Sequence, residues 1–207
     1  MPEKPPIALA LTGASGAAYG LRLLEELIRA GRRVYLMVSQ AGQIVVNMET
    51  DLLLPSAPRE AETLLAERYG AADGQLRVFG RNQWSAPVAS GSAPLAAMVV
   101  CPCTTGTLSA IACGSSADLI ERAADVVLKE RRRLILVVRE TPLSEIHLEN
   151  MLKLSRMGAV VLPAVPGFYH RPTRVEELVD FVVARVLDQL GVPHRLLPPW
   201  GEEESSP

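Results

Sequence analysis

The sequence predicts an α/β fold, built as one domain around a parallel β-sheet, and three observations carry this prediction. Apolar runs alternate along the chain with segments of helical periodicity, as they do in βαβ units. The run Leu134–Val138 is aliphatic at every position, which is typical of a strand buried on both faces of a parallel sheet. A chain of 207 residues is long enough for one domain with a substantial core.

The elements can be placed in order along the chain. The aliphatic runs predict strands over Ile7–Leu11, Val34–Val38, Leu76–Phe79, Ala97–Cys101, Leu134–Val138 and Ala159–Leu162. The segments of helical periodicity predict helices over Ala17–Ala30, Gly42–Met48, Arg59–Tyr69, Thr107–Cys113, Leu119–Arg132, Glu145–Met157 and Val175–Leu190. Since no internal repeat or interdomain linker interrupts this series, we expect one domain over residues 1–195 and a partly disordered tail over 196–207.

Composition and charge exclude several classes of protein. A hydrophobic content of 48% and a charged content of 21% exclude a largely disordered chain. The net charge of −2 argues against a general binder of nucleic acid or of membrane surfaces. No apolar run approaches the roughly 20 residues of a membrane span. The odd, clustered set Cys101, Cys103 and Cys113 forms no disulfide framework, and the run Ile7–Leu11 is too short for a signal peptide, so we expect a cytoplasmic protein.

A cation and an acid, Arg139 and Glu140, directly follow the aliphatic strand Leu134–Val138, and Pro142 comes after them. In open α/β sheets, ligands bind at the carboxyl ends of the strands. This segment therefore supplies a contact for an anion and a possible proton donor.

Small residues fill the segment Thr12–Gly20, between the first strand and the first helix. They let the backbone approach a ligand, and free N–H groups at the start of a helix attract phosphate. The spacing of Gly13, Gly16 and Gly20 is not the G-x-G-x-x-G of dinucleotide folds, so a mononucleotide phosphate or the edge of a flavin ring fits better. A tight turn capped by Ser15 is an equally good account of this loop.

Three threonines and a glycine follow the fourth strand, at Thr104, Thr105, Gly106 and Thr107. Their hydroxyls can donate hydrogen bonds to a polar ring or to a phosphate. The cysteines just before them have no histidine or second cysteine pair at metal-site spacing. We interpret these cysteines as small buried apolar residues and expect no metal.

Charged residues on two predicted helices allow two interpretations each. Arg122 and Lys129 are seven residues apart and share a helical stripe with Asp125, which fits either a solvated ladder of ion pairs or an anion site. Arg185 shares a face with apolar residues of the last helix, so its guanidinium is expected to face the core and to need a partner. That partner is Asp188 or a bound phosphate, unless the side chain extends to solvent.

Two further positions have weaker support. Tyr169 lies in the segment Pro163–Pro172, which three prolines stiffen, so it is either held where a ligand would bind or only packed at the surface. His147 and Asn150 share a helical face, and we expect a structural hydrogen-bonding role for this histidine rather than a catalytic one.

Taken together, several of these segments resemble the flavin prenyltransferase family. They are Leu11–Ala17, Ala89–Ser92, Arg122–Arg132, Arg139–Leu143, Ile146–Met151 and Pro166–Tyr169. The similarity runs from Ile7 to Gly191, and the joint pattern is highly specific.

Members of this family join a dimethylallyl group to reduced FMN and so build a fourth ring on the isoalloxazine. The prenylated FMN then serves a partner decarboxylase, including one of ubiquinone biosynthesis. The resemblance implies a flavodoxin-like (Rossmann-like), doubly wound parallel sheet. It also implies a homo-oligomer, a dodecamer, whose sites form between subunits.

Carried over by position, the resemblance also implies site residues. FMN would be held by Gly13, Ala14, Ser15, Ser39, Thr104, Thr105, Gly106, Thr107 and Arg139. Dimethylallyl phosphate would be surrounded by Ser90, Gly91, Arg122, Lys129, Glu140, Tyr169 and Arg185. The threonine loop departs from the commoner serine-methionine-lysine-threonine form, and Glu49 and Trp84 are further candidates for the pocket lining.

The chemistry of an allylic monophosphate assigns roles to these residues. Such a phosphate leaves poorly unless its charge is neutralised, and Arg122, Lys129 and Arg185 would neutralise it without a metal. We expect Glu140 to protonate the departing phosphate and Ser15 to relay a proton near the reactive nitrogen of the central flavin ring.

Two other functions fit parts of the sequence. A flavin-dependent cysteine decarboxylase on a related fold would resemble this chain at the flavin loop but has no obvious use for the three cations. A non-catalytic flavin carrier would bind FMN without turning over a prenyl donor. An acid beside a cluster of phosphate-binding residues favours catalysis.

Overall fold

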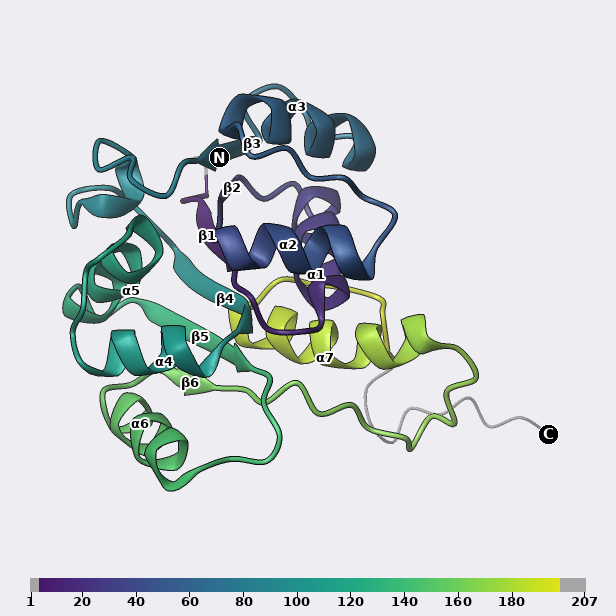
Figure 1. Ribbon diagram of the computed structural model, residues 1–207. Helices are drawn as coiled ribbons and strands as arrows, with labels where there is room; N and C mark the ends of the chain where they lie inside the picture. The colour runs from purple at the N-terminus through teal and green to yellow at the C-terminus, as the bar shows by residue number, and fades with distance from the viewer. Residues whose placement is uncertain (1–3, 198–207) are drawn as a thin grey trace.

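Six parallel strands form one sheet in the order β3-β2-β1-β4-β5-β6, in a computed structural model that describes residues 4–197 (Figure 1). The strands are β1 (Ile7–Leu11), β2 (Val34–Val38), β3 (Leu76–Phe79), β4 (Ala97–Cys103), β5 (Arg133–Val138) and β6 (Val160–Val161). The strand order reverses between β1 and β4, and in open α/β sheets ligands bind at the carboxyl edge beside such a reversal. The predicted doubly wound, flavodoxin-like fold is confirmed.

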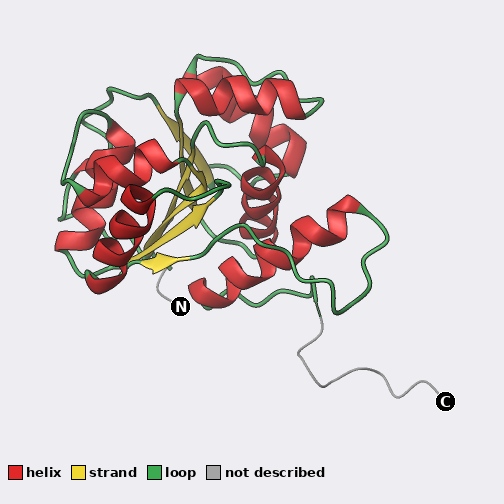
Figure 2. Cartoon of the chain, turned by 60° about the horizontal axis from the view of Figure 1, so that its bottom comes forward, coloured by secondary structure: helices red, strands yellow, loops and turns green. Residues whose placement is uncertain are grey.

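Helices cover both faces of this sheet (Figure 2). One face packs against α1 (Ala17–Arg29), α2 (Gln40–Glu49), α3 (Pro58–Tyr69) and α7 (Val175–Leu190). The other packs against α4 (Thr105–Ala112), α5 (Leu119–Lys129), α6 (Glu145–Arg156) and the short 3₁₀ helix η1 (Pro87–Ala89).

The strand residues divide between two apolar cores because successive side chains of a strand point to opposite faces. Leu9, Val99 and Ile135 belong to the core under α1 and α7, whereas Ala8 and Leu134 belong to the core under α4 and α5. Every residue of β1 and β4 is buried, as expected of central strands in a parallel sheet.

Several predicted boundaries are wrong, and local hydrogen bonds explain the differences. β4 continues past Cys101 because its register shifts after Val100 and Cys103 then pairs with Val138. α4 begins at Thr105, two residues early, because the side chain of Thr104 accepts a hydrogen bond from the N–H of Thr107 and caps the helix. For the same reason α2 begins directly after its cap Ser39.

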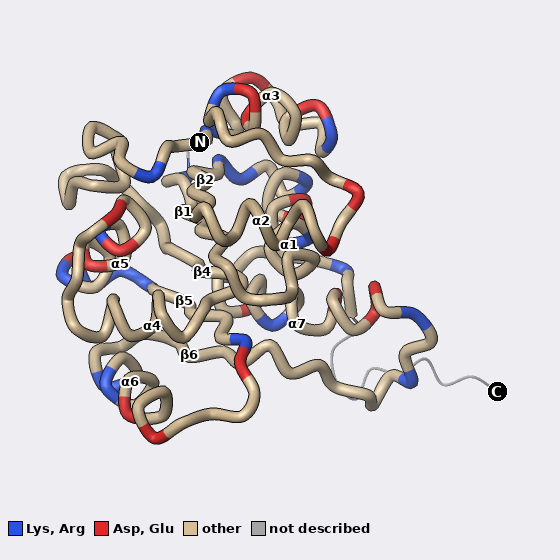
Figure 3. The backbone as a smooth tube through the Cα atoms, viewed as in Figure 1, with Lys and Arg blue, Asp and Glu red and all other residues tan. Residues whose placement is uncertain are grey.

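All described strands belong to one sheet and therefore to one domain. The end of this domain at residue 195 stays a prediction. The predicted tail falls mostly at positions 198–207, outside the described residues. Within residues 4–197, no helix has the length and apolar character needed to cross a membrane. Acidic and basic residues are interspersed along α3, α5 and α6, which agrees with the small net charge (Figure 3).

Candidate functional site

Three loops that the sequence singled out meet at the carboxyl edge of β1, β4 and β5. The hydroxyl of Thr12 donates to the carbonyl of Pro102 at 2.8 Å and accepts from the N–H of Thr104 at 2.9 Å. The N–H of Arg139 donates to the carbonyl of Cys103 at 3.3 Å. The predicted grouping of these loops at one edge is therefore confirmed.

The glycine loop after β1 lets two helix N-termini approach this edge. A Cβ atom at Gly13 would overlap the Cβ of Ala41, so only glycine allows α2 to lie this close to the loop. Gly16 has a left-handed backbone (φ 109°) and begins α1 without a side-chain cap of its own. The side chain of Ser39 begins α2 by accepting from the N–H of Gly42 at 3.0 Å. Two helix starts beside one loop make this a favourable place for an anion.

Glu49, from the last turn of α2, reaches across to the start of α1. Its Oε2 accepts hydrogen bonds from the N–H groups of Gly16 at 2.8 Å and Ala17 at 2.9 Å. Partial burial works to raise the pKa of Glu49, but the hydrogen bonds from Ser15, Gly16 and Ala17 and the charge of Arg139 outweigh it and lower that pKa. More than 30 residues separate Glu49 from these partners in the sequence, so only the fold brings them together.

Arg139 lies close enough to Glu49 and to Tyr19 for its charge to lower the pKa of each. Burial and the neighbouring Cys101 dominate at Tyr19, so the pKa of this phenol is raised overall. The ring of Tyr19 also lies against Gly16. The structure thus groups a hydroxyl, a carboxylate, a guanidinium and a phenol around the loop after β1.

Glu140 connects the end of β5 to the threonine loop. Its Oε1 accepts from the N–H of Thr141 at 3.0 Å, and the hydroxyl of Thr105 donates to its Oε2 at 3.5 Å. Thr104 and Thr107 form the capped start of α4, with their hydroxyl oxygens 2.9 Å apart. The predicted FMN residues therefore share one edge of the chain, and Glu140, predicted to act on the donor phosphate, lies there too.

Four of the predicted donor-phosphate residues gather at a different place, beside α5. A Cβ atom at Gly91 would lie 2.8 Å from Lys129 Nζ, and Arg122 Nε donates to the carbonyl of Ala89 at 3.1 Å. Ser90 is the next residue of this loop. The loop leads into β4 and the end of α5 leads into β5, so Lys129 lies toward the amino edge of the sheet, whereas Arg122 belongs to the first turn of α5.

Carboxylates pair with the cations of this group. Arg122 Nη1 lies 2.9 Å from Asp125 Oδ2, as the ion-pair interpretation predicted, whereas Lys129 pairs with Glu130 rather than with Asp125. Arg132 holds the loop in place by donating to the carbonyls of Gly91 at 2.8 Å and Ala93 at 2.6 Å.

Arg185 and Tyr169 lie apart from both groups. Arg185 does not face the core, because 55% of its side chain is exposed; it pairs with Asp188 at 2.6 Å, so the Asp188 and solvent alternatives that the sequence left open are both observed. Its helix, α7, covers the opposite face of the sheet from α5. Tyr169 is 74% exposed on the connection between β6 and α7. Within one chain, Arg185 therefore lies apart from Arg122 and Lys129.

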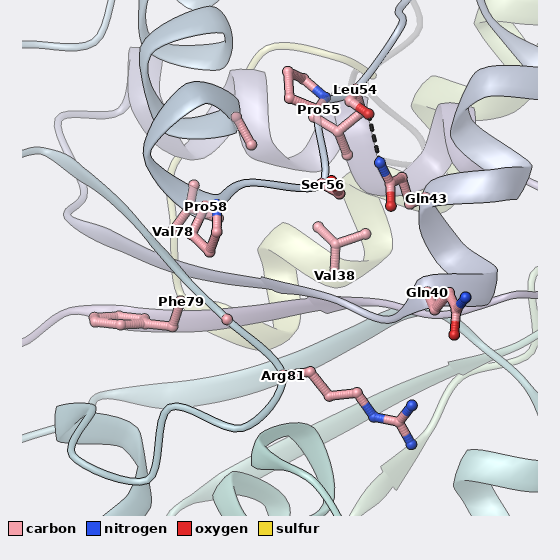
Figure 4. Close-up of a pocket in the computed structure, with 12 residues that line it drawn as sticks. Val38, Gln40, Gln43, Leu54, Pro55, Ser56, Pro58, Val78, Phe79 and Arg81 are labelled. Carbon is pink, nitrogen blue, oxygen red and sulfur yellow. Dashed lines mark hydrogen bonds between the residues drawn. The ribbon is translucent and has the colours of Figure 1, made fainter.

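The remaining candidates have structural or separate positions. His147 forms a capping box with Ser144 at the start of α6, which confirms its structural role, and Trp84 is half-exposed before η1. Cys101 and Cys103 are buried, as predicted, and burial raises their pKa. A hollow of about 290 Å³ lies at the ends of β2 and β3, between Gln43 and Arg81 (Figure 4). It is one strand removed from the flavin loop, and none of the predicted FMN residues lines it.

Comparison with known proteins agrees with this geometry. The family model described as Flavoprotein matches residues 1–187. The flavin prenyltransferase UbiX of Pseudomonas aeruginosa is 61% identical over 202 residues, which cover 98% of this chain and 96% of that protein. The chain belongs to the flavin prenyltransferase family.

Solved structures extend this comparison. AnUbiX (PadA1), in complex with FMN and dimethylallyl pyrophosphate, superposes with a TM-score of 0.86 at 42% identity over 98% of this chain and all of that one. A dodecameric FMN-dependent UbiX-like decarboxylase from Escherichia coli O157:H7 has a TM-score of 0.81 at 40% identity, over 91% of this chain and 96% of that one. The FMN-dependent cysteine decarboxylase TvaF is only 20% identical, so its TM-score of 0.59 shows a shared fold alone.

Proposed function

We propose that this flavin prenyltransferase-family protein joins the dimethylallyl group of dimethylallyl phosphate to reduced FMN and releases prenylated FMN. The observation that carries the proposal is the grouping of Ser15, Glu49, Arg139 and Glu140 at the crevice between β1 and β4. An acid beside a glycine-lined edge is more than a binding module needs. The shared fold of the cysteine decarboxylase gives that alternative no specific support.

The residues at this edge fit FMN. Gly13 leaves room where a side chain would collide with α2, and N–H groups at the starts of α2 and α4 can bind a phosphate, while those of Gly16 and Ala17 donate to Glu49. Ala14, Ser15, Ser39, the loop Thr104–Thr107 and Arg139 would complete the contacts. When bound and reduced, the flavin supplies the nucleophilic ring atoms for attack on the allylic carbon.

The side chains of this chain would move the protons. Ser15 is hydrogen-bonded to Glu49, whose charged form is stabilised, so the hydroxyl has an acceptor beside the ring nitrogen that must lose its proton. Glu140, linked to Thr105, would protonate the departing phosphate. Arg122, Lys129 and Arg185 would neutralise that phosphate as the bond from carbon to oxygen breaks.

This function requires neighbouring copies of the chain, because α5 and α7 present their cations on opposite faces of one sheet. A site that joins the flavin edge of one copy to Arg122 and Lys129 of another and Arg185 of a third satisfies the geometry. The dodecameric state of the UbiX-like relative supports such an assembly here. The product would pass to a separate decarboxylase. The proposal includes the presence of that decarboxylase in the same cell.

The decisive experiment is an anaerobic single turnover with reduced FMN and dimethylallyl phosphate, followed by the mass and absorbance of the flavin. We expect the mass of one added prenyl group with wild-type protein, and a rate about 100-fold or more lower with Ser15→Ala and Glu140→Gln. Glu145→Gln, an exposed acid on α6, is the matched control and should keep the wild-type rate. FMN binding without any prenylation would instead identify a carrier.

A further inference from the structure

The turn that follows α7 brings a histidine back beneath the last turn of that helix. Gly191 ends α7 in the left-handed conformation (φ 62°), and the N–H of Val192 donates to the carbonyl of Leu187 at 3.0 Å. Val192 is buried in the core and anchors the turn. The chain direction after this cap is therefore fixed, and it places His194 against Asp188.

The hydrogen bonds of His194 determine which ring nitrogen carries the proton. The N–H of Leu196 donates to Nδ1 at 3.4 Å, so Nδ1 is the acceptor and Nε2 is the donor. Nε2 then donates to Oδ1 of Asp188 at 3.0 Å, while Oδ2 of the same carboxylate pairs with Arg185 at 2.6 Å. Only 9% of the His194 side chain is exposed, so this ring is held in place, whereas Arg185 extends to the surface.

We propose that Asp188 and His194 are positioning residues for Arg185. The ring of His194 fixes one oxygen of the carboxylate, and the other oxygen then fixes the guanidinium, which makes no other ion pair within residues 4–197. An arginine held in advance loses less conformational entropy when it binds an anion than a freely rotating one does. Asp188 and His194 thus tune the affinity for the phosphate group of the prenyl donor, and this inference rests on the proposed function.

Steady-state prenylation of reduced FMN tests the inference through the split between KM and kcat. His194→Ala should raise the KM for dimethylallyl phosphate about three- to tenfold, with kcat and the affinity for FMN changed less than about twofold. His194→Gln should restore most of the wild-type KM, because its amide N–H can replace the Nε2 donor. His147→Ala, the capping histidine of α6, is the matched control and should leave this KM unchanged.

A double-mutant cycle separates positioning from general stability. In an Arg185→Ala background, His194→Ala should have no further effect on kcat/KM, because its influence passes through Arg185. Additive effects, or a fall in kcat and melting temperature without a change in KM, would overturn the inference. If the wild-type protein forms no prenylated flavin, the proposed function fails instead. If Arg185→Ala itself leaves KM unchanged, both the role of Arg185 and this inference are overturned.

Discussion

At the flavin edge, residues distant in sequence meet within one chain, whereas the donor cations lie on helices that cover opposite faces of the sheet. Glu49 reaches Ser15 and Gly16 because the strand order reverses between β1 and β4 and brings α2 beside the start of α1. Arg122 and Arg185 have no such meeting point in a single copy. The strand order therefore brings the flavin-edge residues together within one chain, whereas the donor cations of the proposed site can meet only when several copies assemble.

The largest expected effect comes from mixing two inactive variants. Arg122→Ala and Arg185→Ala chains should each lose about 100-fold in kcat/KM, because each removes one charge that stabilises the leaving phosphate. Co-expressed as differently tagged chains, they should form mixed assemblies with about a quarter of the wild-type activity, if one site takes the two arginines from different chains. Activity of purified mixed assemblies is the measurement.

The matched control mixes wild-type chains with chains that carry both substitutions. If one site takes its two arginines from different chains, this mixture should again have about a quarter of the wild-type activity. If both arginines come from one chain, it should have about half. In that second case the two single variants would regain nothing when mixed. Such a result would contradict the division of the site among copies.

At the flavin edge, Gly13→Ala should damage both the fold and FMN binding. The new Cβ would overlap Ala41 Cβ and lie 3.3 Å from its carbonyl carbon, so backbone rather than a flexible side chain must move. We expect a cost of about 1–3 kcal/mol in the free energy of unfolding, measured by denaturant titration. FMN affinity, measured by fluorescence titration, should fall about tenfold or more.

Gly106→Ala is the control for that prediction, because its Cβ would meet only Thr104 Oγ1, at 3.8 Å. This change should leave stability unaltered. A selective loss of FMN affinity would then support Gly106 as a flavin contact, and an unchanged affinity would contradict it.

At the donor loop, Gly91→Ala should affect KM more than stability. Its Cβ would press on Lys129 Nζ and the carboxylate of Glu130, which are the ends of flexible side chains and can move away. We therefore expect the KM for dimethylallyl phosphate to rise about three- to tenfold with FMN affinity unchanged. A large drop in melting temperature would show that this loop supports the fold rather than the donor.

Much of the fold could be predicted because its cause is local. Aliphatic runs fix the positions of β1, β2 and β3. The extension of β4 to Cys103 could not be predicted, since it depends on pairing with Val138 across the sheet. The glycine, threonine and Arg139 segments could be predicted as parts of one site because each follows a strand, and the carboxyl ends of parallel strands share one edge of the sheet.

The structural partners of the site were hidden from the sequence because they depend on tertiary position. Glu49 follows Gly16 by 33 residues, and no local pattern connects them. The direction of the Arg185 side chain could not be predicted, because its apolar neighbours Phe181 and Val182 differ in burial. Val182, Val183 and Val186 form the side of α7 that packs on the sheet. Helical periodicity alone does not decide between such adjacent faces.

The smallest expected effect tests the contact that joins α2 to α1. Glu49→Gln keeps an acceptor for Gly16 and Ala17 but removes the charge that favours the start of α1. Because Glu49 is exposed and water screens its charge, we expect a loss below about 1 kcal/mol at pH 7. That loss corresponds to a melting temperature only about 2–4 °C lower at most.

The dependence of this effect on pH identifies its cause. The pKa of Glu49 is lowered in the folded protein, so the charged form stabilises the fold above the usual glutamate pKa of about 4.3, and this contribution is lost as the pH falls through the lower folded pKa. The melting temperatures of wild type and Glu49→Gln should therefore differ at pH 7 and converge once the pH falls below the lowered pKa of Glu49 in the folded protein. Glu149→Gln, an exposed acid on α6, is the matched control and should leave the melting temperature at pH 7 unchanged. A Glu49→Gln difference that persists at low pH would assign the contact to hydrogen bonding or packing, and not to charge.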